Sequence, residues 1–225
     1  MPRSHRYLPV GLPAHLVQRG VNKQIVFRHD GDRKAFLNWL RVNAHRYQVS
    51  IHAWVLMTNH IHILATSKSE GGLSSMMAKT TGRYAAYFNH RYGRTGPLWQ
   101  GRFKACLVAS RAYLLLCYRY IELNPVRAGL VNNPEDFEWS SYRCNGMGVE
   151  SKLCSPHEVY LGLGMSKLER LQCYRGYFGC AIEEVQLAKI RDMTKHGGLL
   201  VKKGNEKKVQ NRLEEIYGVL QISGC

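Results

Sequence analysis

The sequence lacks any long apolar run, and its longer uninterrupted stretches are as short as AYLLLC at residues 112–117. A helix that spans a membrane needs about 20 mostly apolar residues. The first residues, MPRSHRYLPVG, also contain no apolar core of the length that a secretory signal needs. We therefore expect a cytoplasmic protein with no membrane partner.

Paired cysteines are also missing. The seven cysteines are odd in number, and no two of them form a C-x-x-C pair. This pattern argues against a zinc knuckle and against a disulfide framework, and it fits a reducing cytosol.

Acidic residues are scarce in the middle of the chain. No Asp or Glu lies between Glu70 and Glu122, whereas eight Lys or Arg residues do. The net charge of the whole chain is +16, and residues 1–145 carry +13 of it. A field of this sign attracts polyanions, chiefly nucleic acid.

The pattern of apolar residues predicts an α+β fold. Strands are expected near residues 15–19, 49–56, 61–66 and 103–108, and the second and third of these join near Thr58-Asn59. Helices are expected near residues 32–47, 73–92 and from 111 onward, with Asp30 or Asp32 as a cap of the first and Ser110 as the N-cap of the last. The order β-α-β-β-α-β matches a ferredoxin-like antiparallel sheet with helices on one side, which leaves the other face open for a site. The small-residue stretch CNGMGVESK predicts a boundary between a domain of residues 1–145 and a C-terminal helical extension of residues 146–225, whose role we leave unassigned.

Two histidines stand one residue apart in an apolar strand. His60 and His62 project to one face of that strand, whereas Ile61 and Ile63 point to the other. Two imidazoles at this spacing can ligate one metal ion. The alternative is a pair of half-buried strand residues, so the hypothesis requires a third ligand.

A helix near residue 120 offers that ligand and a nucleophile. Tyr120 and Asn124 are four residues apart and share a helix face, whereas Tyr118 points about 160° away from Tyr120. A tyrosine hydroxyl has a pKa near 10, so attack on a phosphodiester requires help from a divalent cation, for which we expect Mg²⁺ or Mn²⁺. Alternatively, Asn124 caps a turn that starts at Pro125, and Tyr120 is an interface aromatic. We expect Glu122 to face solvent or a salt bridge and not the metal.

Five segments in order resemble the REP-associated tyrosine transposases, a branch of the single-tyrosine HUH endonucleases. They are QRGVNKQIVF (18–27), HAWVLMTNHIHIL (52–64), GRYAAYFNHRYGRTGPLWQGRFKACLV (82–108), RYIELNPVRAGLV (119–131) and PEDFEWSSYR (134–143). His60-Ile61-His62 is similar to the histidine motif of that family. The match runs over about residues 5–145.

The resemblance implies a specific reaction. Tyr120 would attack a phosphate of single-stranded hairpin DNA, form a 5′-phosphotyrosine link and release a 3′-OH, and reversal would rejoin the strands. His60, His62 and an amide one turn after the tyrosine would hold the divalent metal, and Asn124 stands where other single-tyrosine transposases have Gln. The family is generally domesticated, so we expect a bacterial protein that acts on palindromic repeats of the nucleoid.

Roles in DNA binding follow for basic and aromatic residues. Arg19, Asn22 and Lys23 are expected to contact guide bases, and Tyr84 and Tyr87 to stack on bases or to belong to the core. The remaining DNA-binding candidates are Arg83, Arg91, Arg94, Trp99, Arg102, Phe103 and Lys104.

Two other functions compete with DNA nicking. One is a non-catalytic module that binds hairpin DNA or RNA on the same fold. The other is a metal hydrolase of small molecules, but residues 31–121 contain only Asp32 and Glu70 as acids. The sequence does not decide between a monomer and a homodimer.

Overall fold

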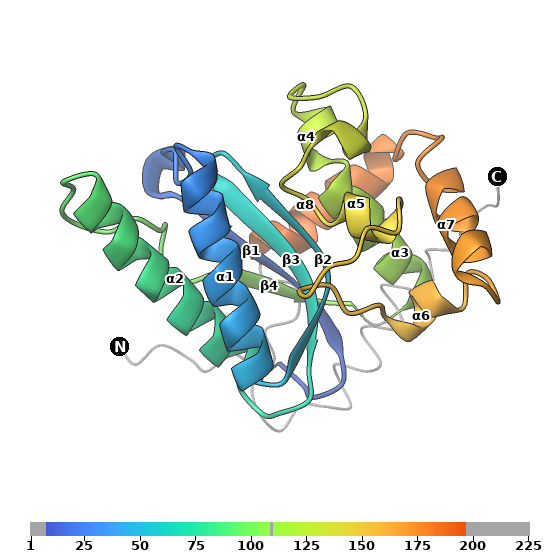
Figure 1. Ribbon diagram of the computed structural model, residues 1–225, viewed down its shortest axis with the longest axis horizontal. Coiled ribbons are helices and arrows are strands. Elements are labelled where there is room, and N and C mark those ends of the chain that lie inside the picture. The colour runs from blue at the N-terminus through green and yellow to red at the C-terminus, as the bar shows by residue number, and fades with distance from the viewer. Residues whose placement is uncertain (1–7, 109, 197–225) are drawn as a thin grey trace.

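The computed structural model describes residues 8–108 and 110–196 (Figure 1). In chain order its elements are β1 (Pro13–Arg19), η1 (Val21–Lys23), α1 (Asp30–Arg46), β2 (Val49–Met57), β3 (His60–Ser67), α2 (Gly72–Arg91), β4 (Lys104–Leu107), α3 (Arg111–Glu122), α4 (Asn124–Arg127), η2 (Pro134–Asp136), α5 (Tyr142–Asn145), α6 (Glu158–Leu161), α7 (Lys167–Gly176) and α8 (Glu184–His196). The predicted order of strands and helices is confirmed as far as α3.

The four strands form one antiparallel sheet in the order β2-β3-β1-β4. The two central strands, β3 and β1, pair from Pro13 opposite Thr66 to Arg19 opposite His60. Met57 pairs with His60, which leaves Thr58 and Asn59 as the predicted hairpin turn. This topology is the ferredoxin-like arrangement, so the predicted fold class is confirmed.

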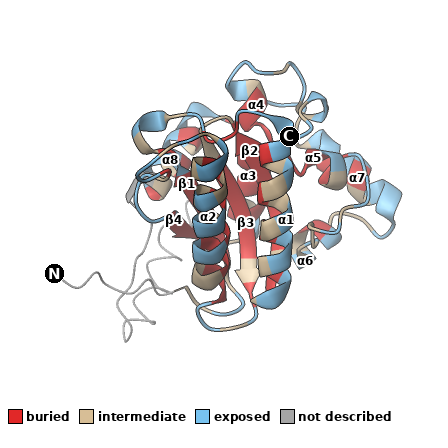
Figure 2. Cartoon of the chain, turned by 60° about the vertical axis from the view of Figure 1, so that its left-hand side comes forward, coloured by how far each residue is buried: buried red, intermediate tan, exposed pale blue. Residues whose placement is uncertain are grey.

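Helices α1 and α2 lie side by side on one face of the sheet (Figure 1). The apolar stripe of α1 consists of Phe36, Leu40 and Ala44, which recur every four residues and are all buried. Tyr84 and Phe88 repeat the same spacing on α2 and are buried too. The polar outer faces of both helices remain exposed (Figure 2).

The opposite face of the sheet is covered, and the expectation of an open face was wrong. Helix α3 packs against β2 and β3, and α8 packs against β4. Every residue of α3 from Tyr113 to Tyr118 is buried. A helix with so wide an apolar surface has to be enclosed, so it folds back onto the sheet. The strands are therefore buried between two helical layers (Figure 2).

Short helices beyond residue 145 pack behind α3. The Tyr118 ring lies 6.1 Å from the Tyr160 ring and 5.9 Å from the Tyr174 ring, measured between centroids. The boundary near residue 145 stays a prediction. No helix in the described part of the chain is long and apolar enough to cross a membrane.

Candidate active site

The two histidines of β3 project toward α3. Their ring centroids are 5.0 Å apart, and Ile61 between them is fully buried. Arg19 lies opposite His60 in the β1–β3 ladder, and directly opposite residues of an antiparallel pair share a face. The sheet therefore places Arg19, His60 and His62 together at the end of β1.

Hydrogen bonds select which nitrogen of each ring is available. His60 Nδ1 lies 2.6 Å from Asn59 Oδ1, an acceptor, so Nδ1 donates and Nε2 keeps its lone pair. The amide of Asn59 is oriented by its Nδ2, which donates to the Lys23 carbonyl at 3.1 Å. His62 Nδ1 lies 2.8 Å from His15 Nε2. Both Nδ1 atoms are thus engaged, which leaves Nε2 of each ring as the nitrogen for a ligand.

Tyr120 faces this pair from α3. Its ring centroid lies 5.7 Å from that of His62 and 5.8 Å from that of His15, and both contacts are edge-on. Tyr118 points to the other side of α3, into the cluster with Tyr160 and Tyr174. The helix phase derived from the sequence is therefore the phase that the structure has.

Asn124 stays on the helix face of Tyr120. Its Nδ2 donates to the Tyr120 carbonyl at 2.8 Å, and the residue is buried. The alternative of a cap before Pro125 does not hold, because α4 already starts at Asn124, its N-cap is Leu123, and no side chain caps it. With Nδ2 engaged, Oδ1 is the end of the amide that can act as a metal ligand.

The three site histidines are held in the neutral form. Burial lowers the pKa of His60 to about 4, and the charge of Arg19 acts in the same direction. Burial also lowers the pKa of His15 to about 4 and places that of His62 well below its ordinary value. A neutral imidazole is the form that binds a metal ion.

The donor set fits a divalent cation. Within the described residues, no three His, Cys, Asp or Glu side chains form a group that could hold a metal ion. The amide oxygen of Asn124 lies outside that set of residue types and would complete the His pair. Imidazole and amide donors carry no charge and suit Mn²⁺ better than Mg²⁺, which prefers an all-oxygen shell.

Arg127 lies over the Tyr120 ring, and the sequence analysis did not identify it as a site residue. The Arg127 guanidinium carbon is 4.7 Å from the centre of the Tyr120 ring, and the residue is exposed. Its position seven residues after Tyr120 returns it to the same helix face, which is the signal that could have found it. His15 was also missed, because only strand pairing places it beside His62.

The predicted DNA-binding residues divide between several surfaces. Arg19, Asn22 and Lys23 are exposed beside the His pair, and Arg102 and Lys104 are exposed near the start of β4. Arg83 lies on the helical layer, where its guanidinium stacks 5.2 Å from the Trp39 ring. These assignments stay predictions.

The remaining candidates contact other residues of the fold, although Arg91 among them is exposed. Arg91 Nε is 3.6 Å from Asp32, and Trp99 Nε1 donates to the Thr81 carbonyl at 2.9 Å. Phe103 is buried, and Tyr84 belongs to the core.

The prediction for Glu122 was wrong. Its side chain is fully buried and accepts hydrogen bonds from Ser141 Oγ at 2.5 Å, Asn145 Nδ2 at 2.8 Å and the Tyr174 hydroxyl at 2.6 Å. Burial raises the pKa of Glu122 to about 7, although these hydrogen bonds oppose the rise. Sequence reasoning placed it away from Tyr120 but could not foresee that later segments would cover that side of α3.

A histidine pair that faces one tyrosine on a ferredoxin-like sheet is the arrangement that the sequence resemblance implied. The family model of the IS200-like transposases matches residues 10–124, just over half of the chain. The chain belongs to this family, and DNA transposition is its broad class of function. No curated protein matches the chain.

One solved structure supports the fold. A REP-associated tyrosine transposase bound to a REP hairpin matches with a TM-score of 0.56 at 19% identity, over 70% of this chain and 93% of that chain. A provisionally assigned transposase from Deinococcus radiodurans R1 matches with a TM-score of 0.36 at 19% identity, over 54% of this chain and 96% of that chain. A bacterial tRNA(His) guanylyltransferase-like protein in complex with GTP matches with a TM-score of 0.37 at 17% identity, over 58% of this chain and 72% of that chain. The last two scores are too low to carry any argument.

Proposed function

We propose that the protein is a metal-dependent endonuclease and strand transferase that acts on single-stranded hairpin DNA. The observation that carries this proposal is the contact of Tyr120 with His62, at 5.7 Å between ring centroids, on the face that also holds Asn124. The net charge of +16 supports a nucleic-acid substrate. The hairpin bound by the related transposase supports the choice of hairpin DNA.

In the proposed reaction, the phenolic oxygen of Tyr120 attacks a DNA phosphorus. The new bond joins phosphorus to tyrosine, the bond from phosphorus to the 3′ oxygen breaks, the phenol loses its proton and the departing oxygen takes one up. The products are a 5′-phosphotyrosine and a 3′-OH, and the reverse step rejoins strands. A divalent ion, when bound, neutralises charge at the phosphate.

The protein's own groups prepare this step. His60, His62 and Asn124 are the proposed metal ligands, and Asn59 and His15 hold the two imidazoles so that Nε2 of each is presented. The Arg127 guanidinium beside the Tyr120 ring adds positive charge where the phosphate would approach.

We further propose that residues 1–145 carry the catalysis and that the described part of residues 146–225 braces α3. Tyr174 supports this role because it contacts both Tyr118 and the carboxylate of Glu122. The tyrosine helix is thereby fixed from behind while Tyr120 faces the histidines. A fixed helix keeps the nucleophile in register with the phosphate.

The test is a covalent-adduct assay on the full chain. Labelled single-stranded hairpin DNA, taken from repeats that flank the gene, is incubated with Mn²⁺ or Mg²⁺ and separated on a denaturing gel. We expect a protein–DNA band that is lost in Tyr120→Phe and retained in Tyr118→Phe, which removes one hydroxyl from the other side of the same helix.

Two outcomes would contradict the proposal. A band lost only in Tyr118→Phe would identify Tyr118 as the nucleophile, on the side of α3 that faces away from the histidines. Tight, salt-sensitive binding without an adduct under either metal would favour the non-catalytic binding module.

A further inference from the structure

A basic cavity opens beside the turn that leads into His60. Its volume is about 580 Å³, within the range of roughly 300–1,000 Å³ that is usual for ligand sites. The lining residues are Gln24, Ile25, Phe27, Arg28, Arg33, Thr58 and Arg94. Three of the seven are arginines and none is acidic. Only Arg94 belongs to the DNA-binding residues predicted from the sequence.

The arginines of the cavity are held at defined positions. Arg28 lies over the Tyr92 ring, 4.4 Å from its centre, and Arg94 Nη2 donates to Gln24 Oε1 at 2.8 Å. Arg33 lies between two rings, 5.7 Å from Phe27 and 5.6 Å from Trp139. Guanidinium groups whose rotamers are restricted in this way lose less entropy when they bind an anion.

Arg33 is not satisfied by its neighbours. Its side chain is only 13% exposed, and the ion pair that it makes within residues 8–108 and 110–196 is a 3.4 Å contact of Nη1 with Asp30. Its Nε is buried and has no hydrogen-bond partner among the described residues. An ordered water or ion is a usual partner for such a buried N–H group, and the rest of the Arg33 guanidinium lines the cavity.

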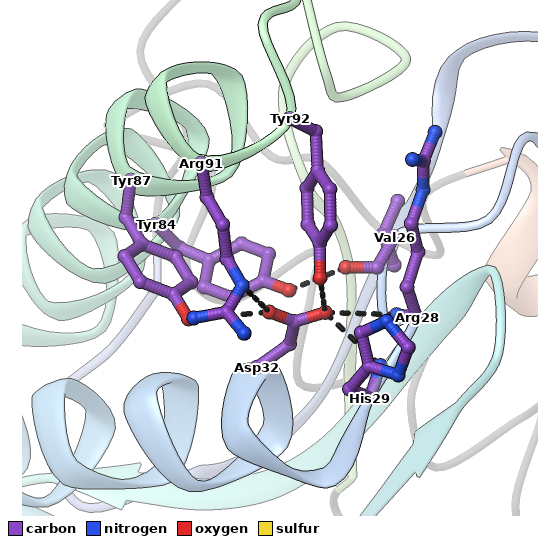
Figure 3. Close-up of polar contacts among 8 residues, drawn as sticks. All are labelled: Val26, Arg28, His29, Asp32, Tyr84, Tyr87, Arg91 and Tyr92. Atoms are coloured by element: carbon purple, nitrogen blue, oxygen red, sulfur yellow. Dashed lines mark hydrogen bonds and ion pairs between the residues drawn. The ribbon is translucent and has the colours of Figure 1, made fainter.

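The buried carboxylate of Asp32 fixes the position of Arg28, one of the lining residues, and Figure 3 shows its polar contacts. Asp32 accepts from the Arg28 and His29 backbone N–H groups at 2.9 and 3.1 Å and from the Tyr92 hydroxyl at 2.7 Å. Burial alone would raise the pKa of Asp32, but these hydrogen bonds and one from Tyr87 hold it below its ordinary value. Asp32 therefore fixes both the backbone of Arg28 and the ring on which its guanidinium rests.

Hydrogen bonds across the Thr58-Asn59 turn join the cavity to the proposed active site. Val26 N donates to the Thr58 carbonyl at 2.9 Å, and Asn59 Nδ2 donates to the Lys23 carbonyl. Asn59 is also the residue that orients His60. The cavity and the His pair thus lie on either side of one two-residue turn.

We propose that this cavity binds one nucleotide of the unpaired strand next to the cleaved phosphate. Arg28, Arg33 and Arg94 contact the phosphate, and Ile25, which is 52% exposed, gives an apolar surface for the base. The inference rests on the proposed function, since it names where the strand lies beyond the scissile bond.

The test compares two labelled hairpins by fluorescence anisotropy with the full chain. One hairpin ends at its stem, and the other carries a short single-stranded extension. In Arg28→Gln and Arg94→Gln we expect weaker binding of the extended hairpin alone. The slope of log K against log salt should fall by about 0.7 for each phosphate contact with a single strand. The matched control is Arg41→Gln, an exposed arginine of α1 outside the cavity, which should change neither hairpin.

If the variants lose affinity equally for both hairpins, or for neither, the inference is overturned. It is also overturned if the wild-type protein does not bind the extended hairpin more tightly than the other. Titration with deoxyadenosine monophosphate tests the other source of the same chemistry. Binding of this free nucleotide that Arg28→Gln abolishes, without any effect of the DNA extension, would assign the cavity to a small molecule instead.

The adduct assay separates this inference from the proposed function. Selective loss on the extended hairpin without any covalent band would leave the cavity assigned while the nicking reaction fails. A normal covalent band, without any selective loss of affinity for the extended hairpin in the variants, would support the nicking reaction and contradict the assignment of the cavity.

Discussion

His15 Nε2 lies 2.8 Å from His62 Nδ1, and both rings are buried beside Tyr120. His15 Nδ1 has no partner among the described residues. When His62 presents Nε2 to a metal ion, its Nδ1 carries the proton and donates to His15. His15 therefore determines that His62 carries its proton on Nδ1, and this leaves His62 Nε2 free to be a metal ligand.

The first prediction concerns this contact. His15→Phe keeps a ring at this position but removes the nitrogen that accepts from His62 Nδ1, so we expect the affinity for Mn²⁺ to fall about 10- to 100-fold, as is typical for outer-shell partners. Isothermal calorimetry of the protein without DNA measures it. His52→Phe is the matched control, since His52 is also a buried strand histidine but bonds Ser155 and Thr66. Equal losses in both variants would make His15 a merely structural residue.

The second prediction concerns the guanidinium on the tyrosine. Arg127→Gln should slow adduct formation and lower the salt slope of binding by about 0.7, because one contact with a single-stranded phosphate is removed. Arg143→Gln, an exposed arginine of α5, serves as the control. Identical salt slopes for wild type and Arg127→Gln would show that Arg127 does not touch the DNA.

The third prediction concerns pH and Glu122. The pKa of Glu122 is raised from 4.5 to about 7 in the folded protein, so the folded state holds a proton that the unfolded state releases between these values. Stability from this group is therefore full below pH 4.5 and is lost as pH rises through 7, by roughly 3 kcal/mol. Glu122→Gln should remove that slope in urea unfolding between pH 5 and 8. An unchanged slope would mean that Glu122 ionises normally.

The fourth prediction concerns the basic residues near β4. Arg102→Ala should weaken binding to every hairpin to a similar extent and reduce the salt slope by about one, as expected for a phosphate contact. Arg41→Ala on α1 controls for the change in net charge. A salt slope that stays at the wild-type value would refute the assignment of Arg102.

The strands and helices of the first 122 residues follow from local pattern. The hairpin turn at Thr58 and Asn59, the N-cap at Ser110 and the phase of Tyr120 against Tyr118 were all predictable, because they depend on neighbours within a turn or two. The N-cap residue of α1 was not predictable in this way. His29 is the N-cap and Asp32 lies at the third helical position, where its side chain accepts from the His29 backbone.

The sequence by itself determined the fold class, the family and the face that His60 and His62 share, because periodicity and motif spacing are properties of adjacent residues. Tertiary structure alone decided that His15 meets His62, that three distant donors enclose Glu122, and that Arg28, Arg33 and Arg94 line one cavity. Each of these contacts joins segments that are separated by a strand, a helix or more. Which of them meet is set by strand order and by the burial of apolar helix faces, which no local pattern contains.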